Sequence, residues 1–158
     1  MPVRGGSVKS FKALLSKIKL YNFSRINEYE EKVRDFHTAT GSAVDVPFSA
    51  DLLAFCDCLL VEELTELQAE IARGIDEMTQ KGGVTPETKA NMMKEMADVQ
   101  YVLSGMAVTF GLPIDEVFSS VHESNLSKFG ADGNPVLRED GKIMKGPNYH
   151  PPKLDDLL

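Results

Sequence analysis

Apolar side chains recur at helical spacing along most of the chain between residues 24 and 128. Positions three or four apart share one face of an α-helix, so this spacing predicts a series of amphipathic helices. The alternation that is typical of strands is almost absent. The predicted fold class is therefore all-α, a bundle of four to five helices. Two of its apolar stripes are Leu60, Leu64, Leu67 and Ile71, and then Met92, Val99, Val102 and Met106.

Start and stop signals set the expected helix boundaries. Ser49 is a candidate N-cap, and Thr85 stands before Pro86, a residue favoured at the first helical position. Gly111 is placed to end the helix that begins there. We expect helices over residues 9–19, 24–39, 49–80, 85–110 and 114–128.

The pattern breaks after residue 130, where turn dipeptides follow one another. Short apolar pairs flank Asp140-Gly141, which predicts a small hairpin in an irregular C-terminal tail. We therefore divide the chain into a basic N-terminal extension (1–23), a helical domain (24–130) and a tail that completes or covers the site (131–158). The extension resembles a transit peptide in composition, but we favour a basic helix that packs on the acidic body or on a second subunit.

Composition narrows the partners. The net charge is −7 and the isoelectric point is near 5.0, which argues against a nucleic-acid partner. No apolar run reaches the roughly 18–20 residues of a membrane span, and no secretory signal is recognisable. Cys56 and Cys58 are spaced i,i+2, which suits neither a disulfide within a helix nor a C-x-x-C metal site. Reduced thiols and a cytoplasmic location are expected.

Two groups of carboxylates carry the chemistry. Glu63 and Glu66 share one helix face, as do Glu95 and Asp98, and Glu95 falls in phase with an apolar stripe. A carboxylate on the core side of a helix is costly unless something compensates it. Neither the segment 62–66 nor the segment 95–98 contains a cationic side chain. We therefore expect a divalent ion, Mg²⁺ or Mn²⁺, to compensate the carboxylates. The alternatives are a solvated acidic face and a Glu95–Asp98 pair satisfied by a lysine.

The residue inventory separates the possible chemistries. A di-iron site needs Glu-x-x-His, and none of the three histidines stands three residues after a glutamate. A glycosidase pair typically uses another fold. Mg²⁺-assisted phosphoryl chemistry needs phosphate-binding donors as well, and the chain offers Asn125, Lys128, Lys142 and Lys145. Each of these four could equally be a helix cap or a solvated charge.

The acidic motifs resemble a known signature. Glu62-Glu63-x-x-Glu66, then twenty-eight residues, then Glu95-x-x-Asp98, is similar to the motif of the all-α nucleoside triphosphate pyrophosphohydrolases. These are the MazG-like proteins, the dimeric dUTPases and phosphoribosyl-ATP pyrophosphohydrolase. Further segments are similar to the MazG-like, phosphoribosyl-ATP pyrophosphohydrolase-like branch, namely Val33-x-x-Phe36-His37, the run 121–128 and the run 138–147.

The resemblance implies hydrolysis between the α and β phosphates, which yields a monophosphate and pyrophosphate. By motif position, Mg²⁺ would be held by Glu63, Glu66, Glu95 and Asp98. Glu62 would bind a further metal or orient the attacking water, so the implied catalytic pair is Glu62 and Glu63. Asn125 and Lys128 would meet phosphate or sugar, and Lys142 and Lys145 the leaving pyrophosphate. A homodimer or a dimer of dimers is also implied.

The functional hypothesis is a Mg²⁺-dependent enzyme that hydrolyses a (deoxy)nucleoside triphosphate and cleans the nucleotide pool. One alternative is phosphoribosyl-ATP pyrophosphohydrolase, and another is a non-catalytic helical dimer with a regulatory or partner-binding role. The sequence does not name the base, which Phe36, Phe55 or Tyr101 could stack on.

Overall fold

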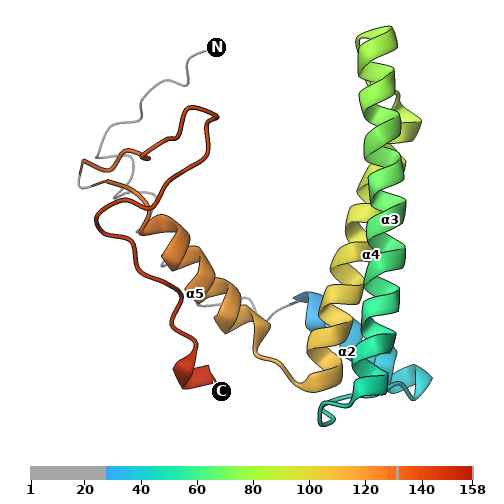
Figure 1. Ribbon diagram of the computed structural model, residues 1–158. Coiled ribbons are helices and arrows are strands. Elements are labelled where there is room, and N and C mark those ends of the chain that lie inside the picture. Colours follow the sequence, from blue (N-terminus) through green and yellow to red (C-terminus); the bar gives the residue numbers. More distant parts are fainter. Residues whose placement is uncertain (1–27, 131, 158) are drawn as a thin grey trace. The chain divides into compact units, whose positions relative to one another are not determined.

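The structure, a computed structural model, describes residues 28–130 and 132–157. Within these ranges it is all-helical, with no strand and only isolated bridges at Phe129–Pro135 and Leu137–Ile143. This confirms the predicted fold class. The predicted helix over 9–19, the extension 1–23 and the first residues of the helix predicted over 24–39 lie outside the described residues. The elements are α2 (Glu28–Thr40), α3 (Ala50–Lys81), α4 (Pro86–Phe110), α5 (Ile114–Leu126) and a short 3₁₀ turn, η1 (Asp155–Leu157) (Figure 1).

The described chain divides into two compact units, residues 28–112 and residues 113–157. The first holds α2, α3 and α4, and the second holds α5 and the tail. Among the described helices, none is long and apolar enough to cross a membrane by itself, and only α4 and α5 taken together as a broken segment have that length and composition.

The helix ends follow the capping signals. Ser49 Oγ accepts a hydrogen bond from the backbone N–H of Leu52, and Thr85 Oγ1 accepts one from that of Thr88. Gly111 ends α4 with φ 63°, a left-handed conformation that glycine adopts without strain. One boundary was wrong, because α5 ends at Leu126 and not at residue 128. Beyond it the backbone N–H of Lys128 and of Phe129 bond three residues back, and the chain turns towards the Phe129–Pro135 bridge.

The long helices α3 and α4 run side by side in opposite directions, as Figure 1 shows. At Gly74 a Cβ would lie 2.8 Å from Met92 Cε, the end of a flexible side chain on α4, so the glycine leaves room for that methionine. The turn between the helices is fastened by Glu77. Its carboxylate accepts hydrogen bonds from the backbone N–H of Thr85 at 2.7 Å and from the hydroxyls of Thr85 and Thr88 at 3.1 Å. These bonds fix which residues of α3 face which residues of α4.

Helix α2 packs against the second half of α4. Val33 is buried, and His37 lies beside Gly105, where a Cβ would stand in ordinary van der Waals contact with His37 Nε2 at 3.6 Å. His37 itself is half-buried, with Nδ1 2.9 Å from the carbonyl oxygen of Ala43. Buried Ser104 donates a hydrogen bond to the Glu30 carboxylate. Polar groups between these two helices are thus mutually satisfied, as burial requires.

The linker between α2 and α3 is fastened to the end of α4. The backbone N–H of Asp45 donates to the carbonyl of Val108 at 3.0 Å. The Arg34 guanidinium binds both carboxylate oxygens of Asp45, at 2.6 and 2.9 Å. Phe48 stacks on Phe110 with ring centroids 4.5 Å apart. The base of the helical hairpin is therefore its best-packed part.

The core is thin. The buried hydrophobic side chains in the described ranges are Val33, Ala107, Val108 and Phe110. The apolar stripe predicted on α3 is only partly covered, since Leu64 is 39% exposed and Ile71 is 43% exposed. Other large apolar side chains of α3 stand open to solvent as well: Leu53, Phe55, Val61, Ile75 and Met78. A monomer rarely leaves so much apolar surface uncovered.

The second unit contains the predicted hairpin, which the structure confirms. The backbone N–H of Arg138 donates to Lys142 at 2.8 Å, and that of Met144 donates to Val136 at 2.7 Å. The end of the tail then runs along α5. There Ser124 Oγ donates to the carbonyl of His150, and its own burial shows how closely the tail covers it.

Glu77→Gln should lower the melting temperature at pH 7, because the neutral amide accepts more weakly from the two threonines than the carboxylate does. Hydrogen bonds hold the pKa of Glu77 below its ordinary value of 4.5, and the largest effect comes from the backbone N–H of Thr85. A lowered pKa contributes stability above the ordinary value, and that stability is lost as the pH falls through the lowered pKa. The difference between variant and wild type should therefore narrow below about pH 4.

Thermal melts from pH 3 to pH 8 test this, with Asp76→Asn as a control that removes a neighbouring, exposed carboxylate from the same helix. A difference between wild type and Glu77→Gln that stays constant across the range would contradict the assigned role of Glu77.

Candidate metal centre

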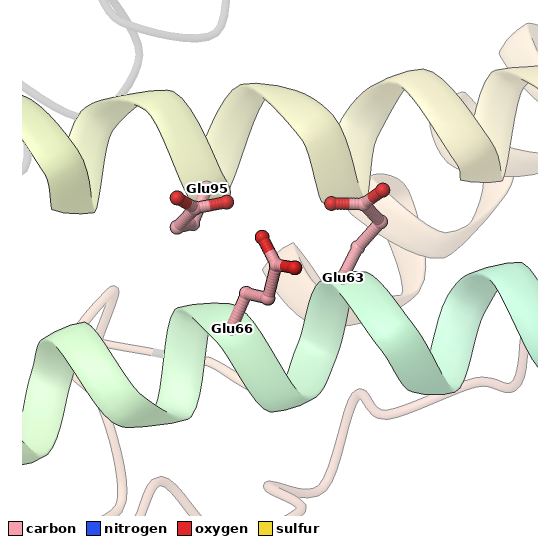
Figure 2. A group of neighbouring side chains, drawn as sticks. All are labelled: Glu63, Glu66 and Glu95. Atoms are coloured by element: carbon pink, nitrogen blue, oxygen red, sulfur yellow. The ribbon is translucent and has the colours of Figure 1, made fainter.

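Three carboxylates converge in the space between α3 and α4. Glu63 and Glu66 come from α3 and Glu95 from α4, and their side chains point towards one another (Figure 2). One oxygen of each lies within 4.8 Å of the others. An octahedral Mg²⁺ with bonds of 2.0–2.1 Å separates its ligand oxygens by about 3 Å when adjacent and about 4 Å when opposite. Small side-chain rotations would bring the three oxygens into that range, so the residues fit such an ion.

The cluster is closed on one side and open on the other. Glu95 is 8% exposed, Glu63 and Asp98 are half-buried, and Glu66 is exposed. Two of the predicted acidic residues lie outside the three-residue group: Asp98, which pairs with Lys94, and Glu62, which was predicted to assist catalysis and is exposed. A ligand could therefore reach the carboxylates from the solvent side, while Glu95 forms the floor.

Neither acidic segment contains a cation, but Lys94, directly before the second segment, pairs with its carboxylates, as in the alternative of a Glu95–Asp98 pair satisfied by a lysine. Its ammonium nitrogen lies 2.8 Å from Asp98, 3.0 Å from Glu95 and 3.9 Å from Glu66. The sequence left a lysine open as the partner of Glu95 and Asp98, but which lysine was not named. The signal was present, since Lys94 and Asp98 are four residues apart and such pairs meet on a helix surface.

The electrostatics show how crowded the carboxylates are. Burial, followed by the charges of Asp98 and Glu66, raises the pKa of Glu63 above its ordinary value, and Lys94 partly opposes this. The hydrogen bonds to Asp98 and Glu95 in turn raise the pKa of Lys94. A raised carboxylate pKa means that ionised Glu63 costs stability above that pKa, and the cost disappears as the pH falls below the ordinary value. The cluster thus holds more negative charge than its surroundings favour.

Glu70 continues the acidic face one turn beyond Glu66. Its side chain is 13% exposed and pairs with Arg73 at 3.4 Å through Oε1. Its second oxygen is buried and accepts no hydrogen bond from any residue that the structure describes. A buried carboxylate oxygen without a donor lowers the stability of the fold. Glu70 therefore extends the uncompensated acidic face beyond the three converging residues.

The four predicted phosphate-binding residues belong to the second unit. Lys128 donates to the Asn125 side chain at 2.6 Å, and the Lys145 ammonium lies 4.4 Å from the centre of the Tyr149 ring. Lys142 is exposed in the hairpin. Their role towards a substrate stays a prediction.

A cavity of about 370 Å³ lies between α2 and α4. Its wall includes Ala97, the residue before Asp98, together with Gln100 and Tyr101. Of the three aromatic residues considered for base stacking, Tyr101 lines this cavity. The ring of Phe36 meets the ring of Tyr101 edge-on, with 5.9 Å between the two ring centroids. Phe55 is exposed on α3. The volume lies within the range of small-molecule sites.

Comparison with protein families places the acidic residues in a known one. The family model described as phosphoribosyl-ATP pyrophosphohydrolase matches residues 31–125, more than half of the chain. That span includes all five acidic residues of the two motifs and ends at Asn125, so Lys128, Lys142 and Lys145 lie beyond it. A search of curated proteins found no match.

Proposed function

We propose that this chain, which belongs to the phosphoribosyl-ATP pyrophosphohydrolase family within the all-α nucleoside triphosphate pyrophosphohydrolases, hydrolyses a (deoxy)nucleoside triphosphate with Mg²⁺. The family makes it a pyrophosphohydrolase, an enzyme that acts on phosphoric anhydrides. The substrate class and the metal are our proposals. The observation that carries the metal is the convergence of Glu63, Glu66 and Glu95 within 4.8 Å. The substrate class rests on the likeness of the acidic motifs to those of the nucleoside triphosphate pyrophosphohydrolases.

The residues divide the work by position. Glu63, Glu66, Glu95 and Asp98 would hold Mg²⁺, for which Mn²⁺ could substitute, since hard oxygen donors suit both ions. When bound, such an ion neutralises phosphate charge and makes a coordinated water more acidic. Glu62 is exposed beside Glu63, where its carboxylate could accept a hydrogen bond from the attacking water. Water adds across the bond between the α and β phosphates, which releases a monophosphate and pyrophosphate.

The remaining parts of the chain serve the same reaction in this proposal. The helical domain (24–130) carries the carboxylates, and the tail (131–158) completes the site. Asn125 and Lys128 would contact phosphate or sugar, while Lys142 and Lys145 would contact the leaving pyrophosphate. Lysines suit this role because they present a compact positive charge on a flexible stem. The cavity beside Ala97 has room for a base, and its tyrosine ring and glutamine amide are groups that a base contacts.

A second candidate substrate is phosphoribosyl-ATP. The family match favours it, because the matching model is described by that activity. The bond that breaks is again the one between the α and β phosphates, so the acidic cluster would serve both substrates in the same way. The difference would lie in what accommodates the adenine and its second ribose.

We also propose that the chain works as a homodimer or a dimer of dimers. The support is the exposed apolar surface of α3, where Phe55 is 58% exposed and Ile75 is 61% exposed. Such surfaces are commonly covered by a second copy in helical proteins. Light scattering should then give a mass at least twice the 17.4 kDa of the chain, and a monomeric mass at micromolar concentration would contradict this.

A substrate panel tests the function. Ribo- and deoxynucleoside triphosphates, dUTP included, and phosphoribosyl-ATP are incubated with and without Mg²⁺, and the products are resolved. Metal-dependent release of a monophosphate and pyrophosphate from a triphosphate is the expected result. Turnover of phosphoribosyl-ATP alone would select the second candidate. No turnover of any compound would contradict the enzyme assignment and favour a non-catalytic helical dimer.

Glu63→Gln and Asp98→Asn should each lower turnover by on the order of 100-fold or more, because each removes a charged oxygen ligand that an amide replaces poorly. Far-ultraviolet circular dichroism should stay unchanged, since neither side chain caps a helix. Asp76→Asn, an exposed carboxylate near the other end of α3, is the matched control and should keep wild-type rates. A variant with near-wild-type activity would exclude its residue from the metal site.

A further inference from the structure

We propose that Lys94 is a built-in counter-ion of the acidic cluster, whose ammonium group takes the place of a divalent ion and is displaced when that ion binds. This inference rests on the proposed function, since it assumes that the cluster binds a metal. It assigns a role to a residue that lies between the two acidic motifs and belongs to neither.

The contacts of Lys94 are those of a cation centred on the cluster. One nitrogen lies 2.8 Å from Asp98 and 3.0 Å from Glu95 on its own helix. The same nitrogen lies 3.9 Å from Glu66 on the facing helix. Consecutive helical residues point about 100° apart, so Lys94 reaches Glu95 only by folding its side chain back over the helix surface. Because solvent is accessible on the other side of Lys94, the negative charge of the carboxylates is what holds its side chain folded back.

The ammonium group is held but can leave. The Lys94 side chain is 62% exposed, so its stem is not locked by packing, and four carbons let the charge swing out into water. Glu95, in contrast, is 10% exposed at its side chain and cannot follow it. Displacement of Lys94 would therefore open the cluster without moving either helix.

Charge explains why a metal ion would win the exchange. One ammonium group, that of Lys94, faces a group of four carboxylates, so net negative charge remains. These are Glu63, Glu66, Glu95 and Asp98. A divalent ion carries twice the charge and binds oxygen at 2.0–2.1 Å, compared with about 2.9 Å for an ammonium nitrogen. By Coulomb's law its attraction to each oxygen is about three times greater at equal dielectric. Lys94 would keep the carboxylates together until the stronger cation arrives.

The test compares Lys94→Met with Lys89→Met, which removes the same charge from an exposed position of α4. Calorimetry with Mg²⁺ alone should show about fivefold tighter binding for Lys94→Met, because the ion no longer competes with an ammonium group. Lys89→Met should change affinity less than twofold. Equal affinities in the two variants would overturn the inference.

Thermal melts supply a signature that a structural lysine would not give. Without metal, Lys94→Met should melt below wild type and below Lys89→Met, because its carboxylates repel one another without a counter-ion. At saturating Mg²⁺ that deficit should vanish, since Lys94 has then left the cluster in the wild type too. A deficit that persists at saturating Mg²⁺ would overturn the inference.

If Lys94→Met does not fold, a Mg²⁺ titration of the wild-type protein followed by NMR tests the displacement of Lys94 instead. The side-chain ¹³Cε and ¹⁵Nζ signals of Lys94, identified by their absence in Lys94→Arg, should shift in step with Mg²⁺ occupancy. Signals that stay fixed while Mg²⁺ binds would overturn the counter-ion role alone. Absence of Mg²⁺ binding by the wild type would overturn the metal site, and the proposed function with it.

Discussion

A carboxylate buried between two helices is the constraint on which the rest of the structure depends. Glu95 is 8% exposed, and an ionised group at that depth is unstable without a compensating cation. The facing residues, Glu63 and Glu66, add negative charge instead of relieving it. The ammonium group of Lys94 compensates part of this negative charge, and a divalent ion would compensate more of it. Such stored electrostatic cost is typical of a binding site and unusual in a part that serves stability alone.

The helical hairpin holds this arrangement in register from its two ends. At one end Glu77 joins the last turns of α3 to the start of α4 through Thr85 and Thr88. At the other end the linker is bonded to Val108, and Phe48 stacks on Phe110. Between these points the helices bury little apolar surface. The site therefore sits where packing is sparse, and a second copy covering α3 would stabilise the same segment that carries Glu63 and Glu66.

Much of this could be predicted from the sequence, for local reasons. Ser49, Thr85 and Gly111 act through their own backbone neighbours, so the ends of α3 and α4 follow from residue type alone. The phase of Glu95 with an apolar stripe likewise indicated its burial. The end of α5 was misplaced because the chain folds there into a local turn, in which Phe129 forms a bridge with Pro135, and such backbone pairing was not read from the sequence. A lysine partner for Glu95 and Asp98 was an open alternative, but Lys94 was not named, because a side chain that folds back along a helix is not visible in a count of charges within each motif. Periodicity shows which face of α3 is apolar but not how much of it is covered.

We propose that the carboxylates of α3 and α4 together bind a divalent cation. Electron paramagnetic resonance with Mn²⁺ tests it directly, because free Mn²⁺ gives a strong signal that binding suppresses. Wild-type protein should remove free Mn²⁺ in a stoichiometric, saturable manner, and Glu95→Gln should not, while its circular dichroism stays unchanged. Equal Mn²⁺ binding by the wild type and Glu95→Gln, or no binding by either, would contradict the account.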